Sequence, residues 1–241
     1  MLCVWRRVGV LLVSLALSGA ATPALGKAKP VAQGMVNGEK LYATQPSGQR
    51  APEDLISKLI RAETKHDMHL TLECVQGTPT ALTAFQTHLQ LADAGQKFAK
   101  LISQHYGGNG WSYIENYLSN ANIPVIPTLP DADAVQNDAD NLHAAKITIL
   151  GDIAQLNKDG STVMQFVRYK KIWRLDLNSL DSSKTDKQYE QETVENRRLL
   201  IAVNKAKGLV ARRPNHRYRG VTVEQAAIAL AKFYAQARAK P

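Results

Sequence analysis

The pattern of apolar and polar residues predicts an antiparallel sheet in the second half of the chain. Residues 145–156 and 161–169 are rich in β-branched and aromatic side chains, which suit half-buried strands. Asp159-Gly160 lies between these runs and supplies the positive φ angles that a tight hairpin turn needs. A third run, residues 172–177, alternates strictly. We therefore expect a three-stranded antiparallel meander.

The third run also predicts which side chains enter the core. Successive side chains of a strand point to opposite faces. Trp173, Leu175 and Leu177 therefore share one face, while Ile172, Arg174 and Asp176 share the other. We expect Trp173 to be buried on the apolar face.

Helical spacing precedes and follows this sheet. Pro52, followed by two acidic residues, starts a helix that should end near His66. Thr78-Pro79 repeats the start signal for a pattern that Gly107-Gly108 stops after Tyr106, and Gly95 leaves open a division into two helices. Two further helices are predicted from Thr185 to Gly208, and from Thr222 onward.

The segment between the early helices and the sheet is less regular. An aromatic cluster beginning at Trp111 and Tyr113 is too short to assign to a helix or a strand. Residues 123–130 contain three prolines, which exclude an inner strand and indicate an edge segment or an extended connector. We expect a loop for the acidic run at residues 131–140.

The first residues have the features of an export signal. Arg6 and Arg7 precede an apolar run, and Ala24-Leu25-Gly26 offers small residues for cleavage, so residues 1–26 are interpreted as a signal peptide. No later stretch of about 18 apolar residues follows, so we expect no transmembrane segment in the mature chain and a periplasmic or extracellular location. Residues 27–50 contain Gly34, Gly38, Pro46 and Gly48 with little apolar periodicity, which indicates a flexible lead-in.

Charge is unevenly distributed after the signal. Residues 27–180 carry 15 Lys+Arg and 15 Asp+Glu, whereas residues 181–241 carry 13 and 6, a net of +7. An exported protein with a neutral body is not expected to bind nucleic acid. Cys74 is the one thiol left after signal removal, so no intramolecular disulfide can form, and we expect it to be buried and unreactive.

The order of these elements resembles the nuclear-transport-factor-2-like superfamily, also called SnoaL-like or cystatin-like. The likeness rests on Gly151-Asp152, the Asp159-Gly160 turn and the tryptophan strand at residues 172–177, and it covers about residues 51–180. Family members typically have a glycine or Asp-Gly turn before that strand. Lys170-Lys171 stands there instead, although lysine tolerates positive φ poorly.

The resemblance implies an α+β fold in which N-terminal helices pack on a curved, cone-like antiparallel sheet. We thus expect a cone-like domain at 51–180, followed by a basic helical C-terminal extension at 181–241. Members of the superfamily include isomerases, dehydratases and non-catalytic binding modules. The fold therefore leaves the function open. The resemblance also implies a cone that is either open to a small apolar ligand, with Trp111 and Tyr113 as our pocket candidates, or filled by side chains.

Acid–base chemistry inside such a cone needs a carboxylate close to a histidine or tyrosine. Asp152, His105 and Tyr106 are the alternative catalytic candidates, although capping of a helix end is the favoured role of His105. His66 and His69, with Glu63 one turn earlier, would bring two imidazoles and a carboxylate together if the helix continued through them. We favour solvated surface there and expect no metal and no cofactor.

A basic segment at residues 212–219 separates the last two predicted helices. Arginine clusters suit phosphate and carboxylate groups through paired hydrogen bonds. The anion-binding candidates are Arg212, Arg213, Arg217 and Arg219, and a solvated loop is the plainer interpretation.

These observations favour an exported, non-catalytic binding protein. Its ligand would be a small apolar molecule or an envelope protein, with anionic surface contact through the basic segment. The alternative is a cofactor-free lyase or isomerase that uses an acid–base pair within the cone.

Overall fold

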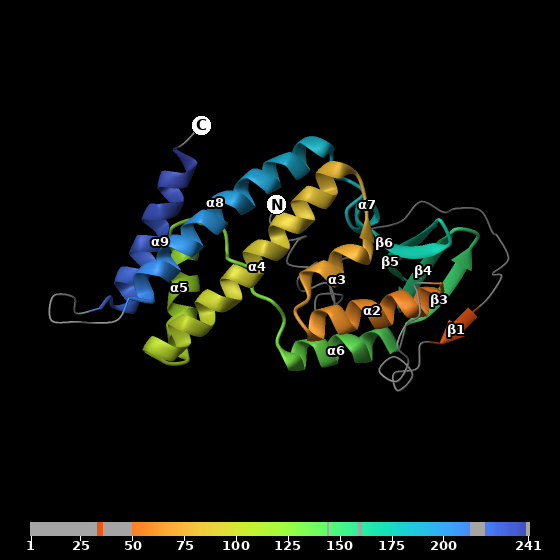
Figure 1. Ribbon diagram of the computed structural model, residues 1–241, viewed down its shortest axis with the longest axis horizontal. Helices are drawn as coiled ribbons and strands as arrows, with labels where there is room; N and C mark the ends of the chain where they lie inside the picture. The colour runs from red at the N-terminus through yellow and green to blue at the C-terminus, as the bar shows by residue number, and fades with distance from the viewer. Residues whose placement is uncertain (1–32, 36–49, 144, 159–160, 213–219, 240–241) are drawn as a thin grey trace. The chain divides into compact units, whose positions relative to one another are not determined.

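The computed structural model describes residues 33–35, 50–143, 145–158, 161–212 and 220–239, and its elements are labelled in Figure 1. These residues form a mixed α/β structure with an open sheet. They divide into two compact units, each made of segments that are far apart in the sequence. Unit 1 contains the described residues up to Leu82 together with Pro130–Asp186. Unit 2 contains Thr83–Leu129 together with the residues from Lys187 onward.

This grouping differs from the predicted order of a domain at 51–180 and an extension at 181–241. Unit 2 combines helices that precede the meander in the sequence with helices that follow it. The predicted signal peptide lies outside the described residues. Within the predicted lead-in, Gln33–Met35 forms a short strand.

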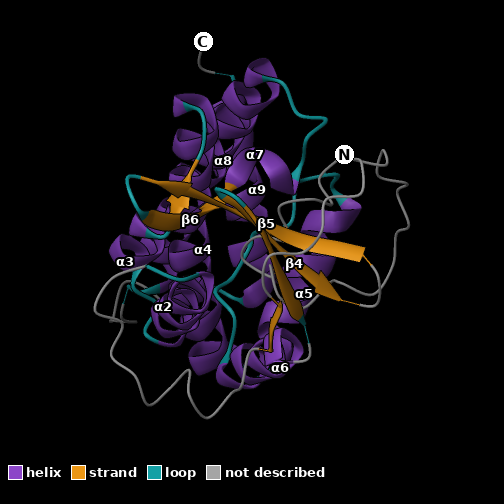
Figure 2. Cartoon of the chain, turned by 90° about the vertical axis from the view of Figure 1, so that its right-hand side faces the viewer, coloured by secondary structure: helices purple, strands orange, loops and turns teal. Residues whose placement is uncertain are grey.

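Unit 1 is built on the sheet, part of which is seen in Figure 2. The described strands follow the order β1-β3-β4-β5-β6-β2. Strands β3 to β6 form an antiparallel meander, with β1 antiparallel at one edge and β2 parallel at the other. The strands are β1 Gln33–Met35, β2 Val75–Gln76, β3 Lys146–Leu150, β4 Ile153–Lys158, β5 Ser161–Tyr169 and β6 Ile172–Asp176.

The meander has one strand more than the sequence pattern predicts. Residues 145–156 form two strands instead of one, because the chain reverses at Gly151-Asp152 and Leu150 pairs with Ile153. Gly151 has a φ of 65°, which a residue without a Cβ adopts without strain at the first position of a two-residue turn. The Asp159-Gly160 turn lies outside the described residues, and the strands on either side of it pair as predicted.

The predicted faces of the last strand are confirmed. Trp173, Leu175 and Leu177 are each at most 2% exposed, whereas Ile172 is 38% exposed. Helix α2, Pro52–Thr64, packs against β6 and contributes fully buried aliphatic side chains, among them Leu55 and Ile60. The strand itself ends at Asp176, which caps the short helix α7, Leu177–Leu180.

The turn between β5 and β6 consists of two lysines with positive φ. Lys170 has a φ of 50° and Lys171 a φ of 66°, and the flanking residues Tyr169 and Ile172 pair. Positive φ at both positions is the requirement of a type I′ turn, which asparagine and glycine meet with less strain. The lysine turn is therefore compatible with the meander, at a cost in backbone strain.

We expect the double substitution Lys170→Asn with Lys171→Gly to stabilise the protein by about 1 kcal/mol, because it relieves left-handed strain in the turn. Chemical denaturation measures the change. Lys170→Gln with Lys171→Gln is the control, since it removes both charges and keeps both β-carbons. An equal gain in this control would assign the effect to charge instead of backbone conformation.

The acidic run predicted as a loop is a helix, which corrects the sequence-based expectation. Helix α6 spans Ala132–His143, and Asp131 caps it by accepting a hydrogen bond from the amide of Ala134 at 2.8 Å. Acidic residues are favourable near a helix N-terminus. Val135, Ala139 and Leu142 form a buried stripe at helical spacing.

The other helices of unit 1 follow local signals. Helix α2 confirms the predicted start at Pro52 and ends at Thr64. A short helix, α3 Met68–Glu73, follows unpredicted and is capped by Asp67, which accepts from the amide of Leu70 at 3.0 Å.

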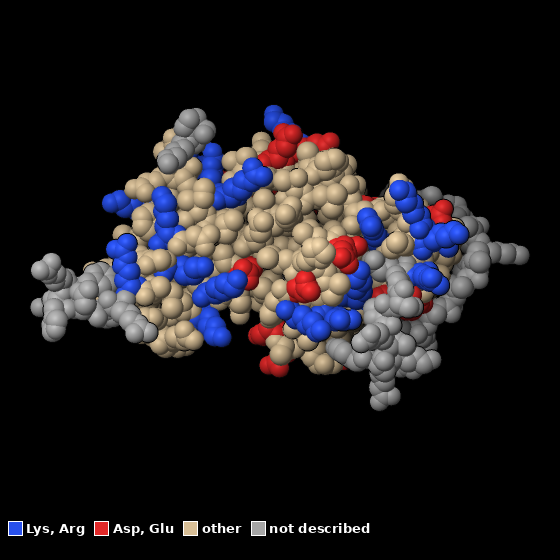
Figure 3. Space-filling model, viewed as in Figure 1, with Lys and Arg blue, Asp and Glu red and all other residues tan. Residues whose placement is uncertain are grey.

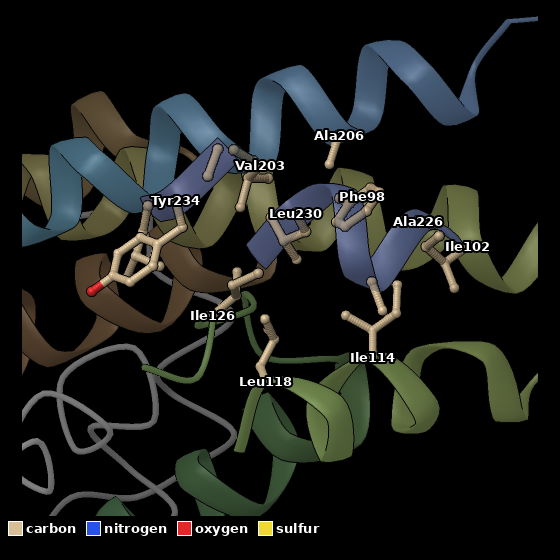
Figure 4. Close-up of a cluster of buried hydrophobic side chains, with 14 of the residues drawn as sticks. Phe98, Ile102, Ile114, Leu118, Ile126, Val203, Ala206, Ala226, Leu230 and Tyr234 are labelled. Atoms are coloured by element: carbon tan, nitrogen blue, oxygen red, sulfur yellow. The ribbon is translucent and has the colours of Figure 1, made fainter. Parts of the chain in front are cut away.

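Unit 2 is helical, and four helices share one core (Figure 4). Within the described residues these are α4 Pro79–Tyr106, α5 Asn109–Asn120, α8 Asp186–Val210 and α9 Val223–Arg238. The first turn of α4 and the first residue of α8 belong to unit 1. The aromatic cluster therefore lies on a helix, with Ile114 and Leu118 buried. The predicted capping box at Thr222 and Gln225 is confirmed, and α8 begins directly after Thr185.

Helix α4 runs through Gly95 without a break. A β-carbon at Gly95 would lie 2.2 Å from the carbonyl oxygen of Pro127 and 2.8 Å from Ile126 Cγ2. The connector at residues 123–130 therefore packs closely against this helix. It lacks regular secondary structure, as predicted. Gly95 permits close packing here instead of ending a helix.

Candidate functional site

The three predicted catalytic residues have contacts within their own units. Asp152, in unit 1, lies in an exposed turn and accepts a hydrogen bond from Arg168 Nε at 2.7 Å. Tyr106, in unit 2, is half-buried and donates from its hydroxyl to the carbonyl oxygen of Val221 at 2.6 Å. His105 is exposed in the last turn of α4, which fits the predicted capping role. An acid–base function for these residues stays a prediction.

The arrangement required for a histidine metal site is absent from the described residues. Helix α2 ends at Thr64, and His66 has a φ of 50°, so the helix does not continue to His69. His69 instead pairs with Glu73 at 3.3 Å on α3. No group of three potential ligands is found in the described part of the chain.

The predicted pocket residues lie on α5. The Trp111 ring packs edge-on against Phe98, with ring centres 5.9 Å apart, and Trp111 covers part of the unit 2 core. Tyr113 is 42% exposed. Their role in binding a ligand stays a prediction.

Cys74 is fully buried, as predicted. Burial raises the pKa of its thiol to about 12, with smaller contributions from Lys58 and Arg174, which lower it, and from Glu73, which raises it. A thiol with such a pKa stays protonated and is a poor nucleophile.

Two carboxyl groups on the neighbouring helices α2 and α6 of unit 1 interact electrostatically. Asp138 is 1% exposed and occupies the buried stripe of α6 beside Val135 and Ala139. Glu63 lies in the last turn of α2, which packs against α6. Glu63 Oε2 and Asp138 Oδ1 are closed to solvent and lack a hydrogen-bond partner in the described residues. We call these two residues the carboxyl pair.

The carboxyl pair is electrostatically unusual. Burial, followed by repulsion from Asp138, raises the pKa of Glu63 to about 8 from an ordinary value of 4.5. Burial also raises the pKa of Asp138 to about 7 from 3.8. Removing a carboxylate from water disfavours its charged form, and a like charge nearby adds to that effect. The carboxyl pair therefore stays protonated at pH values at which ordinary carboxyl groups have lost their protons.

Sequence reasoning missed the carboxyl pair, although half of its signal was present. Asp138 follows Val135 by three residues and precedes Leu142 by four, so it shares an apolar helical face. The surrounding aspartates conceal this spacing by making the whole run look like polar surface. Nothing local identifies Glu63 as the carboxyl group that interacts with Asp138.

A second candidate surface lies on unit 2, where lysine and arginine side chains gather (Figure 3). On α8, Arg197 and Lys205 are exposed on the same helical face as Val194 and Ile201, which are 44% and 48% exposed. Arg212 is exposed just beyond α8, whereas the other predicted anion-binding residues, Arg213, Arg217 and Arg219, lie outside the described residues. We call Val194, Arg197, Ile201, Lys205 and Arg212 the α8 surface.

The α8 surface continues toward α9. Lys205 Nζ lies 5.6 Å from the centre of the Phe233 ring, so the two helices are neighbours at this point. Ile228, Lys232 and Arg238 of α9 are also exposed. Cations and single aliphatic side chains therefore alternate over part of unit 2.

Comparisons with protein-family models, curated proteins and solved structures found no match. Among the described residues, none of the helices has the length and apolar character needed to cross a bilayer. The likeness to the nuclear-transport-factor-2-like superfamily accordingly stays a prediction from the sequence, and the arguments about function rest on the surfaces and groups described above.

Proposed function

We propose that this protein is an exported, non-catalytic binding protein, and that the α8 surface of unit 2 holds an acidic protein partner. The observation that carries this proposal is the combination of exposed cations with exposed aliphatic side chains on one face of α8. Charge complementarity would steer an acidic partner to this face, and desolvation of Val194 and Ile201 would add affinity.

The burial pattern of unit 1 favours this surface over an interior ligand. Trp173 and Phe166 of the sheet and Leu55 of α2 are each at most 2% exposed. The cone-like arrangement belongs to the proposal as well, because α2 packs against β6, the last strand of the antiparallel meander. A cone of this kind would be filled by side chains and would serve as a scaffold.

An anionic membrane is the less favoured partner. Interfacial helices bind membranes by burying a wide apolar face with large side chains. The apolar face of α8 is instead enclosed in the unit 2 core, where Leu199, Val203 and Val210 are at most 3% exposed. The exposed face offers separated aliphatic groups among charges, which suit a protein surface.

We expect the full chain without its signal to bind poly-L-glutamate, used as a probe for acidic proteins. Raising the salt concentration from about 50 to about 300 mM should weaken the binding at least tenfold, because screening shortens the reach of exposed charges. The triple variant Arg197→Gln, Lys205→Gln, Arg212→Gln should lower the affinity at least fivefold while its unfolding curve is unchanged, since exposed charges contribute little to stability.

The matched control removes three cations from unit 1 by Arg61→Gln, Lys65→Gln and Lys146→Gln, all of which are exposed. It changes the net charge equally and should retain parental affinity. Equal losses of affinity in both variants would show that binding depends on net charge alone and would overturn the assignment to the α8 surface. Binding to phosphatidylglycerol vesicles that exceeds binding to poly-L-glutamate would replace the protein partner with a membrane.

A further inference from the structure

The carboxyl pair occupies a position where packing alone calls for apolar side chains. Asp138 lies in line with Val135, Ala139 and Leu142 on the face of α6 that is buried. An ionised carboxylate at such a position costs free energy unless a cation or hydrogen-bond donors compensate it. Oδ1 of Asp138 and Oε2 of Glu63 have no hydrogen-bond donor within the described residues.

Most of the charged groups on the neighbouring elements interact with residues other than the pair. On α2, Lys58 Nζ lies 2.8 Å from Glu73 on α3, and His69 pairs with that same glutamate. Asp67 caps α3, and Asp131 caps α6. On β6, Arg174 slightly lowers the pKa of Cys74, and its Nε is buried without a hydrogen-bond partner in the described residues. Asp140 of α6 accepts a hydrogen bond from Gln136 at 3.0 Å. The opposing carboxyl is the charge that acts on Glu63.

We propose that the carboxyl pair is a proton-dependent latch, which keeps α2 and α6 docked while it holds a proton and loosens them when both carboxyls ionise. Two ionised carboxylates that interact in a desolvated environment would repel each other. Separation of the two helices or entry of water would relieve that repulsion. A proton on either carboxyl neutralises that group and removes the repulsion.

The direction of the pH dependence follows from proton binding. Both carboxyls have a higher pKa in the folded protein than in the unfolded chain, so the folded form binds more protons between the two values. The stabilisation is complete below the ordinary values of 4.5 and 3.8. It is lost as the pH rises through about 7 and about 8. Acidification therefore tightens this contact, opposite to the usual effect on a paired carboxylate.

The latch accounts for the pair better than catalysis does. Both unpartnered oxygens are closed to solvent, so a substrate would first have to open the contact between the helices. A proton reaches such a site through small fluctuations, whereas a substrate does not. The inference is independent of the partner proposed for α8, because it concerns residues of unit 1 only.

Hydrogen exchange of the full chain without its signal tests the latch. Protection factors of amides in residues 135–142 would be measured at about pH 5 and about pH 9, which bracket the expected transition. Protection factors already correct for the intrinsic effect of pH on the exchange rate. In the parent, protection should fall at least tenfold at the higher pH.

Glu63→Gln and Asp138→Asn mimic the protonated carboxyls without loss of volume. Each should keep protection at the higher pH within about threefold of its value at the lower pH, since one charge of the pair is gone. Asp133→Asn, at an exposed position of α6, is the control and should retain the parental pH dependence. A parental protection factor that does not change with pH would overturn the latch.

Infrared difference spectroscopy of the same proteins provides a measurement that does not depend on helix opening. The parent should lose a protonated carboxyl band as the pH is raised from about 5 to about 9, and each single variant should lose less of it. An unchanged band in the parent would overturn the latch. Protection restored at high pH by added calcium in the parent, and not in Glu63→Gln, would replace the latch with a cation site.

Discussion

Trp173→Ala should lower the free energy of unfolding by about 3–5 kcal/mol, the range for truncation of a large aromatic side chain in a core. Trp173 is 2% exposed on β6, and the Arg168 guanidinium lies 5.3 Å from the centre of its ring. The substitution removes the largest side chain in the core of unit 1 and that cation–π contact. Denaturant unfolding followed by circular dichroism measures the change.

The neighbouring residue provides the matched control. Ile172 belongs to the same strand, points to the opposite face and is 38% exposed. Ile172→Ala should therefore cost less than about 1 kcal/mol, as expected for a partly exposed position. Similar losses for the two variants would contradict the register of β6. A loss below about 1 kcal/mol for Trp173→Ala would place that side chain outside the core.

Gly95→Ala should destabilise the protein by about 2 kcal/mol, although alanine is the better helix former by about 1 kcal/mol. The new β-carbon would meet the carbonyl oxygen of Pro127 at 2.2 Å. A backbone oxygen cannot turn away as a flexible side chain can, so the connector must shift from α4. That shift exposes Ile126, which is 2% exposed in the unit 2 core.

Gly208→Ala tests the same substitution where space is available. Gly208 is exposed near the end of α8, and a β-carbon added there would meet no heavy atom of the described residues within 4 Å beyond its own stretch of helix. Alanine should stabilise the protein there by about 0.5 kcal/mol, through helix propensity and reduced freedom of the unfolded chain. The opposite signs at the two positions are the result to look for in chemical denaturation. A gain at Gly95 would show that the connector does not press on α4.

The distribution of the proposed functions between the units has a physical consequence. The latch would respond to pH through buried groups in unit 1, whereas the α8 surface would respond to salt through exposed charges in unit 2. Screening acts strongly on exposed charges and weakly on buried ones. Salt and pH should accordingly affect partner binding and α6 protection separately.

Local signals in the sequence determined much of the secondary structure. The proline start of α2, the capping box of α9 and the alternation of β6 each depend on neighbours within a few residues. Local geometry decides such features because caps, turns and strand faces need only adjacent backbone groups. The same reasoning failed at two places. At Gly151 the surrounding strand-forming residues concealed a turn, and in α6 the surrounding acidic residues concealed a buried apolar stripe.

Tertiary structure alone decided which distant segments meet. The grouping of α4 and α5 with α8 and α9, the approach of Pro127 to Gly95 and the pairing of Glu63 with Asp138 all join residues far apart in the sequence. The hydrophobic effect drives burial without specifying a partner, so an apolar stripe predicts that a face is covered and not what covers it. Shape complementarity and close packing determine which segment covers the face, and both depend on the three-dimensional positions of the two surfaces.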